Sequence, residues 1–376
     1  MRNIIMLLSC LMDLILVFYC IFSKSNRTKV GLLCGILAFV LLIGTFYLLM
    51  FPRYEKLKPT GEYEVATKVI TFTDETQTLV YAKESLPESV TCGIWYPDSK
   101  DIDVHTCPLV LFSHGSFGTR SNNESMYHEL ASHGYVVCSL DHLYQSFSCK
   151  DENGKKTKIS FTYLNELMKE DATKNPEGSY HSYQKWMKAR CSDINLVIDQ
   201  LLALSEQENS ERVFQLIDGS RIGIAGHSMG GAAALAMGRQ NDKIKAVMAL
   251  EAPFMYDITG VSDGKLVFTN EEYPVPVLNV YSDASYANIS TWPQYAQNAR
   301  YLQDEDPKTL NVHISGAGHL TLCDLSIVSP FLTRVLNGQS SKLSGKECLT
   351  KVNAISLSFF DCYLKGKGTF VESDWN

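Results

Sequence analysis

The chain has 376 residues, of which 45% are hydrophobic and 20% are charged, and its formal net charge is −7. This composition is typical of a globular protein with a large core and argues against a disordered chain. The acidic balance, without any cluster of basic and aromatic residues, argues against nucleic acid as a partner.

Two apolar stretches open the chain, over residues 4–22 and 30–51. The second stretch has 22 residues without a charge, which is long enough to cross a bilayer as a helix. The first carries Asp13 near its middle, which costs roughly 2.5–3.5 kcal/mol on insertion. We therefore predict a transmembrane helical hairpin within a membrane anchor over residues 1–55, followed by one domain over residues 56–376.

The basic residues around the two stretches indicate on which side of the membrane the following domain lies. Lys24, Arg27 and Lys29 lie between them, and a positive connecting loop prefers the cytoplasm, although basic residues after the second stretch partly offset this bias. A cleaved signal peptide is the alternative, but no small-x-small cleavage site precedes Pro52. We expect a two-helix membrane protein whose following domain is extracytoplasmic.

The cysteines give a weaker indication of the compartment. Several flank expected loops, including Cys92 with Cys107 and Cys149 with Cys191. This distribution fits disulfides in an oxidising compartment, and scattered buried thiols are the alternative. The cysteines show no zinc-ligand spacing.

The next segments alternate between strands and helices. Residues 65–73 and 91–96 have the pattern of leading strands. Two further strands, residues 109–112 and 135–140, enclose a helix over about residues 125–132. The order predicts an α/β fold with a mostly parallel central sheet flanked by helices.

The turn after residues 108–113 is the first candidate for catalysis. Residues 114–118 read His-Gly-Ser-Phe-Gly, and such a turn offers backbone N–H groups toward a nucleophile. We expect the N–H of Ser116 to form one half of an oxyanion hole. The alternative is an ordinary strand–helix turn.

Regular patterning stops over about residues 143–187. Charged and polar residues dominate there, with interleaved aromatic residues such as Phe147, Phe161, Tyr163 and Trp186. An excursion of this length within a compact domain is usually functional. We predict a cap insertion whose aromatic residues help to shape a substrate pocket.

The strongest motif follows a helix around residues 193–204. An apolar strand, residues 222–225, leads into Gly226-His-Ser228-Met-Gly230, and small helix-forming residues follow. This is the G-x-S-x-G pattern, in which a serine sits on a sharp strand–helix turn that requires glycine two residues before and after it. The pattern predicts Ser228 as a nucleophile, with the N–H of Met229 as the second oxyanion donor.

The general base is found by elimination. In the α/β-hydrolase fold that this motif indicates, the order along the chain is serine, acid, histidine. Only His313 and His319 follow Ser228. His313 lies within an alternating strand, residues 309–314, whereas His319 follows a glycine-rich loop beyond it, where a base can reach the serine.

Two carboxylates compete to orient this histidine. Glu251 follows the strand over residues 245–250, and Asp283 follows the strand over residues 275–281. Both would lie at the carboxyl edge of the sheet, so the residues alone leave the choice open.

Several motifs together resemble the platelet-activating factor acetylhydrolase family (plasma and type II forms), over roughly residues 60–370. They are residues 111–115 (LFSHG), 130–134 (LASHG), 226–232 (GHSMGGA), 249–252 (ALEA) and 316–319 (GAGH). The resemblance implies Ca²⁺-independent hydrolysis of short or oxidised acyl chains from phospholipids. It also favours Glu251 as the acid, although the family has aspartate there. Relatives of similar appearance are general carboxylesterases or polyesterases.

We therefore predict an α/β-hydrolase fold with a cap insertion and a membrane anchor. The predicted triad is Ser228, Glu251 and His319, and no metal or organic cofactor is implied. The expected activity is cleavage of a carboxylic ester or phospholipid through an acyl-enzyme. The alternatives are a broad carboxylesterase, lipase or polyesterase, and a catalytically dead binding protein on the same fold.

Overall fold

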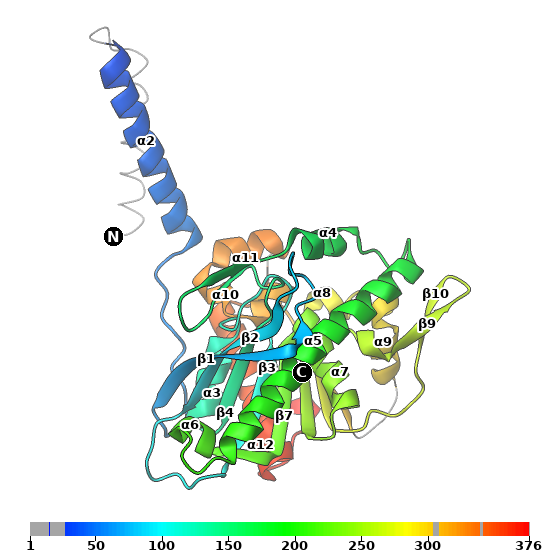
Figure 1. Ribbon diagram of the computed structural model, residues 1–376. Coiled ribbons are helices and arrows are strands. Elements are labelled where there is room, and N and C mark those ends of the chain that lie inside the picture. Colours follow the sequence, from blue (N-terminus) through cyan, green and yellow to red (C-terminus); the bar gives the residue numbers. More distant parts are fainter. Residues whose placement is uncertain (1–14, 16–26, 304–307, 339–340, 376) are drawn as a thin grey trace.

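A computed structural model describes residue 15 and residues 27–303, 308–338 and 341–375. Its centre is an eight-stranded sheet with the order β1-β2-β4-β3-β7-β8-β11-β12 (Figure 1). The strands are β1 (Val65–Thr78), β2 (Pro87–Pro97), β3 (Cys107–Ser113), β4 (Val136–Asp141), β7 (Ile217–His227), β8 (Ile244–Leu250), β11 (Val277–Tyr281) and β12 (Thr309–His313). The strands expected from the sequence are all present.

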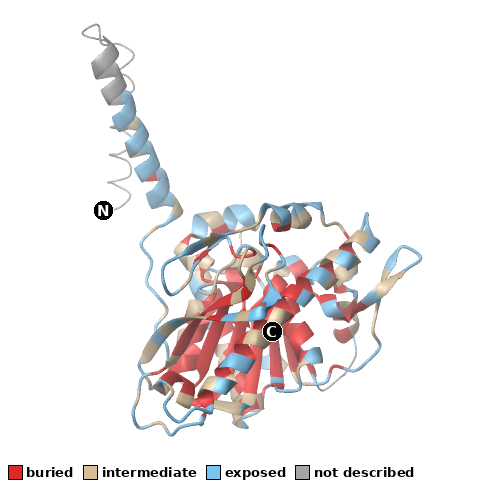
Figure 2. Ribbon diagram, viewed as in Figure 1, coloured by how far each residue is buried: buried red, intermediate tan, exposed pale blue. Residues whose placement is uncertain are grey.

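Within this sheet only the β1–β2 and β2–β4 pairings are antiparallel, and β4, β3, β7, β8, β11 and β12 are parallel to one another. These parallel strands are almost entirely buried, as expected of a sheet covered on both faces (Figure 2). The prediction of a mostly parallel α/β fold is confirmed.

Helices cover the two faces of the sheet and divide the core into two large clusters. One cluster contains apolar residues of α5 (Pro176–Ser205) and α7 (Met229–Gln240). The other contains residues of α3 (Glu124–Ser132) and α12 (Gly345–Lys365), whose apolar residues recur at helical spacing. This arrangement holds the carboxyl ends of β3, β7, β8, β11 and β12 at one edge, where the catalytic residues were expected.

The remaining elements are short and lie mainly on connections. The helices are α4 (Phe161–Lys169), α6 (Arg212–Gln215), α8 (Asp283–Tyr286), α9 (Ala296–Tyr301), α10 (Leu325–Val328) and α11 (Pro330–Leu336). Two hairpins are formed by β5 (Ser148–Lys150) with β6 (Lys156–Lys158), and by β9 (Ile258–Ser262) with β10 (Lys265–Phe268). Single 3₁₀ turns are η1 (Met255–Asp257), η2 (Pro293–Tyr295), η3 (His319–Leu322) and η4 (Glu372–Asp374).

The predicted cap segment, residues 143–187, is more regular than its sequence suggested. It holds the β5–β6 hairpin, α4 and the first turns of α5, which begins well before the expected helix over residues 193–204. Asn175 caps this early start by accepting a hydrogen bond from Gly178 N at 3.0 Å, and Pro176 occupies the first turn. The charged residues that hid the helix in the sequence lie on its outer face, while Trp186 is buried.

The N-terminal helix α2 (Arg27–Met50) extends away from the domain (Figure 1). Most of the first apolar stretch, residues 4–22, lies outside the described residues. Across the described segments, the structure contains no helix that is both long enough and apolar enough to cross a membrane. The predicted transmembrane hairpin is therefore not supported here.

The expected disulfides do not form. Every cysteine from residue 92 onward is a free thiol in the described structure. Cys92 is on β2 and Cys107 is on β3, and β4 lies between these strands. Cys149 lies in the β5–β6 hairpin, whereas Cys191 faces α7, where Gln240 donates to its sulfur at 3.7 Å. Burial raises the pKa of both Cys149 and Cys191 to about 12, so these thiols are unreactive.

Candidate active site

Ser228 occupies the sharp turn between β7 and α7. Its φ of 54° is strained for a residue with a side chain, and its N–H is fixed by Leu250 O at 2.8 Å. A Cβ on Gly226 would lie 2.2 Å from Gly230 O, and one on Gly230 would lie 1.9 Å from Ser113 O. The two glycines are therefore required by close backbone packing, as the motif predicted.

His319 begins η3, on the loop beyond β12. Its carbonyl oxygen lies 3.0 Å from Nε2 of His227, and the two imidazole rings are 4.7 Å apart. His227 immediately precedes Ser228, so this contact ties the loop of the predicted base to the turn of the predicted nucleophile. Burial lowers the pKa of His227 to about 3, and this neutral histidine adds no charge beside His319.

Glu251 lies directly after β8 and faces His319. Its Oε1 is 3.7 Å from Nδ1 of His319, and the carboxylate is 2% exposed while the imidazole is 36% exposed. This distance is longer than a hydrogen bond, and such contacts commonly tighten when substrate binds. The structure therefore brings the predicted acid and base together.

The loop after β11 holds the Glu251 carboxylate in place. Ser282 donates its N–H to Oε2 at 2.5 Å and its hydroxyl to Oε1 at 2.8 Å, and Ser285 N donates to Oε1 at 3.0 Å. Burial raises the pKa of the carboxyl, but the contacts with His319 and Ser282 outweigh burial and leave the pKa below its ordinary value. Glu251 is thus an ionised, oriented carboxylate.

Asp283, the other candidate for the triad acid, contacts a different histidine. Its Oδ1 lies 2.9 Å from Nε2 of His313, and its Oδ2 accepts the N–H of Gly316 at 3.1 Å. The ring of Tyr286 stacks on His313 with centroids 4.0 Å apart. Asp283 therefore secures the end of β12 and the start of the following loop, and the structure pairs it with the histidine that was not predicted as the base.

The expected oxyanion turn lies against the nucleophile. A Cβ on Gly115 would lie 3.2 Å from the Cβ of Ser228, and Gly118 N donates to Gly115 O at 3.0 Å to close the turn. The Ser116 hydroxyl is 3.0 Å from the hydroxyl of Tyr163 in the cap. Met229 is the first residue of α7, where a backbone N–H has no partner within the helix and the helix dipole is positive.

A buried polar network under this turn was missed by sequence reasoning. Arg190 of α5 donates to the carbonyl of His114, to the hydroxyl of Ser113 at 3.3 Å and to Oε1 of Gln145 at 3.0 Å. Its guanidinium is fully buried, which is rare for a charged group and requires such partners. A lone arginine in a helical segment carries no signal of this role in the sequence.

His142 extends the same network. Its Nε2 lies 2.8 Å from the hydroxyl of Ser113, and its Nδ1 lies 2.6 Å from Oδ2 of Asp193. Burial lowers the pKa of His142 and raises that of Asp193, so each is shifted toward its neutral form. Although this is a serine–histidine–aspartate chain, all three residues are buried, which makes it a support for the turn.

The four aromatic residues expected to shape a substrate pocket differ in exposure. Tyr163 and Trp186 are buried, and Tyr163 reaches Ser116. Phe147 and Phe161 are largely exposed to solvent. Within the described residues, His, Cys, Asp and Glu form no group of three or more that could hold a metal ion.

The fold and this site define a class of protein. A serine on the strand–helix turn of a mostly parallel sheet, followed along the chain by a carboxylate and a histidine in contact, is the arrangement of the α/β-hydrolases. Residues 68–376 match the family described as platelet-activating factor acetylhydrolase, isoform II. The chain belongs to this family.

Curated relatives agree with this assignment. The chain is 23% identical over 291 residues to the platelet-activating factor acetylhydrolase of Cavia porcellus, covering 72% of this chain and 60% of the relative. It is 22% identical over 290 residues to that of Gallus gallus, covering 71% of this chain and 64% of the relative. The chain thus spans about three fifths of the length of these relatives.

Among solved structures, a ferulic acid esterase from Streptomyces cinnamoneus is similar in fold. It superposes with a TM-score of 0.62 at 20% identity, over 84% of this chain and 94% of the esterase. At this identity the similarity supports the α/β fold and does not extend to substrate.

Proposed function

We propose that the protein is a serine hydrolase that cleaves carboxylic esters through an acyl-enzyme. The observation that carries the proposal is the distance of 3.7 Å between Nδ1 of His319 and Oε1 of the buried Glu251. The loop of His319 also contacts His227, the residue before Ser228. A solvated loop histidine has no need of a buried, ionised partner, whereas a general base gains orientation and charge stabilisation from one.

The residues would act in the following order. His319 accepts the proton of Ser228 as the serine oxygen attacks the ester carbonyl carbon, and the N–H groups of Ser116 and Met229 stabilise the oxyanion. Collapse of this intermediate breaks the bond to the alcohol, which leaves with the proton from His319. A water molecule then gives a proton to His319 as its oxygen attacks the acyl carbon. The bond from this carbon to the Ser228 oxygen breaks, His319 returns the proton to Ser228, and the carboxylic acid is released.

The substrate class that we propose is a phospholipid with a short or oxidised acyl chain. The support is family membership and the names of the relatives, which are platelet-activating factor acetylhydrolases. A panel that compares acetylated phospholipids, long-chain phospholipids and short p-nitrophenyl esters tests this proposal. Turnover of the p-nitrophenyl esters alone would assign a broad carboxylesterase.

Covalent labelling tests the reaction class separately from the substrate. A fluorophosphonate probe reacts quickly only with an activated serine, so the wild-type protein should be labelled and a Ser228→Ala variant should not. The matched control is Ser116→Ala, which removes a hydroxyl near the nucleophile but keeps the backbone N–H, and which should still be labelled. A folded wild-type protein that resists the probe would instead be a catalytically dead hydrolase.

We also propose that residues 1–51 attach the domain to a membrane. The support is a group of large apolar side chains that are exposed around α2 (Figure 2). They are Ile36, Leu37, Phe39, Val40, Leu42, Ile43, Phe46, Tyr47, Leu48 and Leu49. The full chain should resist carbonate extraction, and a chain that starts at Lys56 should be soluble and active. Extraction of the full chain by carbonate would refute the attachment.

The side of the membrane is part of the same proposal. The positive residues at 24, 27 and 29 favour a cytoplasmic loop, which places the hydrolase domain on the other side. In sealed inside-out vesicles the domain should resist added protease. Digestion before detergent is added would place the domain in the cytoplasm.

A further inference from the structure

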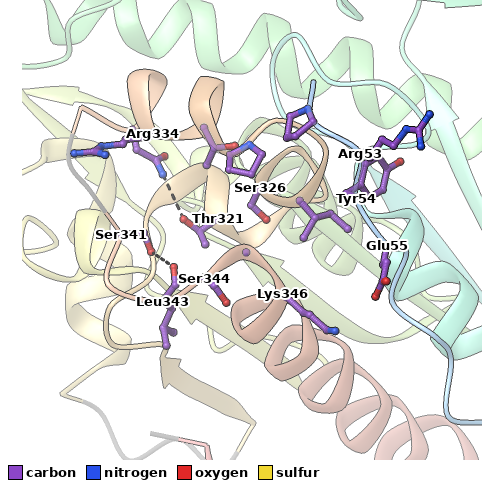
Figure 3. A pocket seen from close by; sticks show the side chains of 16 residues that line it. Arg53, Tyr54, Glu55, Thr321, Ser326, Arg334, Ser341, Leu343, Ser344 and Lys346 are labelled. Atoms are coloured by element: carbon purple, nitrogen blue, oxygen red, sulfur yellow. Dashed lines mark hydrogen bonds between the residues drawn. The ribbon is translucent and has the colours of Figure 1, made fainter. Parts of the chain in front are cut away.

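A cavity of about 610 Å³ lies where the chain leaves α2 and enters the domain (Figure 3), and Thr321, two residues after His319, is part of its wall. Its walls come from residues 52–55, from α10 and α11, and from the first residues of α12. The volume is within the range of roughly 300–1,000 Å³ that is usual for ligand sites. The proposed reaction assigns no role to this cavity.

Two hydroxyl groups in the wall lack a hydrogen-bond partner. Ser326 and Thr333 are 4% and 5% exposed, and in the described structure neither hydroxyl has a hydrogen-bond partner. A buried hydroxyl without a partner is unfavourable, so such groups are usually satisfied by water or by a ligand. Because a hydroxyl can donate, both groups can serve an acceptor-rich ligand.

The charges around the cavity favour an anion. Arg53, Arg334 and Lys346 line it together with one acid, Glu55, in a chain whose net charge is −7. A second carboxylate, that of Glu347, lies behind the wall and accepts hydrogen bonds from the lining residue Ser344. Within the described residues none of these three basic side chains has an ion-pair partner, and all three are exposed. Figure 3 shows Arg53 and Arg334 on opposite sides, with Ser326 between them and with both guanidinium groups directed outward. The cations are therefore available at the rim of the cavity.

The start of α12 adds backbone donors to the same wall. This helix has 21 residues, and its first residue, Gly345, packs so closely on α10 that a Cβ would lie 2.6 Å from the Ser326 hydroxyl. The first N–H groups of a long helix, with the positive end of its dipole, form a common site for phosphate groups. Ser344 and Glu347 form a capping box at this end, so the Ser344 hydroxyl already accepts the Glu347 N–H and the Glu347 carboxylate already accepts the Ser344 N–H. The unpaired Ser326 hydroxyl lies beside this helix end.

We propose that this cavity binds the phosphate group of a phospholipid headgroup. The lipid source rests on the proposed membrane attachment. Ser329 donates its hydroxyl to the carbonyl of Met50, the last residue of α2, and residues 52–55 then line the cavity. A membrane that holds α2 would therefore place its headgroups at the mouth of the cavity.

The wall of the cavity also supports the predicted base. Asn337 accepts the N–H of Leu320 at 2.8 Å and donates to the hydroxyl of Thr321 at 3.3 Å. The Thr321 hydroxyl accepts the N–H of Gly318 at 3.1 Å. Both side chains line the cavity and fix the backbone on each side of His319. A bound headgroup would order this wall and thereby the base.

Binding is tested on the full-length chain in detergent, with Ser228→Ala to prevent turnover. Glycerol 3-phosphate should bind in titration calorimetry, and Arg334→Gln with Lys346→Gln should weaken binding by roughly tenfold or more, because two charge-assisted contacts are lost. Thr333→Val should weaken binding without lowering the unfolding midpoint. The matched control is Lys351→Gln, an exposed position on the same helix outside the cavity, which should change the affinity less than about twofold.

Binding to vesicles shows whether the site takes the headgroup of a phospholipid or only a free phosphate ester. Phosphatidylcholine vesicles that contain phosphatidic acid should bind the chain more tightly than phosphatidylcholine alone, and the double variant should lose this gain. Binding of glycerol 3-phosphate without that gain would overturn the lipid assignment. Absence of glycerol 3-phosphate binding, or binding that the double variant leaves unchanged, would overturn the site itself. Since these measurements need no turnover, they are independent of fluorophosphonate labelling.

Discussion

The contact between Glu251 and His319 makes the identity of the triad acid testable by paired amide substitutions. At 3.7 Å, a unit charge on Glu251 stabilises the imidazolium by about 4.5 kcal/mol at an effective dielectric constant of 20. Glu251→Gln removes this charge. Its amide also places N–H groups against the donors of Ser282 or Ser285, a conflict that costs about 1–3 kcal/mol and displaces the side chain.

Water around the partly exposed imidazole reduces the charge contribution, so the two effects together correspond to a loss on the order of 10³–10⁴ in kcat. Asp283→Asn should cost less than about fivefold, because this side chain is 46% exposed and contacts His313 and Gly316. The loss in kcat for Glu251→Asp should lie between these two values, at roughly 10–100-fold, because the shorter side chain places its carboxylate farther from His319.

The assay is kcat on a soluble p-nitrophenyl ester, with active sites counted by fluorophosphonate titration and folding checked by thermal unfolding. Asp283→Asn is the matched control, because it makes the same chemical change on the neighbouring strand end. A larger loss for Asp283→Asn than for Glu251→Gln would refute the reasoning and transfer the role of acid to Asp283.

Three further outcomes are expected. Ser228→Ala should lower turnover by more than about 10⁴ without unfolding the protein, and activity within tenfold of wild type would exclude this nucleophile. Arg190→Met should lower kcat about 10–100-fold with little change in KM, because the His114 carbonyl loses its buried donor; an unchanged kcat would remove Arg190 from the support of the oxyanion turn. Burial raises the pKa of Asp324 to about 6, so the folded state binds a proton more tightly than the unfolded chain, and the free energy of unfolding should fall as pH rises from about 4 to about 6. Urea unfolding should show that Asp324→Asn removes this fall, and an equal slope in both proteins would contradict the raised pKa.

The sequence by itself determined the parts of the protein that depend on local geometry. The glycines around Ser228 are required because a Cβ at either position would lie 2.2 Å or less from a backbone oxygen, so the turn is visible as a five-residue motif. The strand before Glu251 could likewise be recognised as a short continuous apolar run, which a sheet covered on both faces needs, and the strand before His319 by its alternating pattern. The order of these elements then indicated the fold.

Local sequence patterns did not predict the features that depend on contacts between residues far apart in the chain. The early start of α5 was hidden because its charged outer face masked an inner face that includes Trp186. The paired cysteines looked plausible in sequence, yet β4 separates Cys92 from Cys107. The role of Arg190 depends on residues 45 to 77 positions away, which no spacing rule connects.

The choice between the two acids shows the same limit most clearly. Glu251 and Asp283 each follow an apolar strand, and β8 and β11 are neighbours, so their sequence contexts are equivalent. Only in the tertiary structure do the N–H groups of Ser282 and Ser285 donate to Glu251, while Asp283 contacts His313 instead. The direction of a side chain at a strand end depends on the backbone of the adjacent loop, and that backbone is set by packing across the sheet edge.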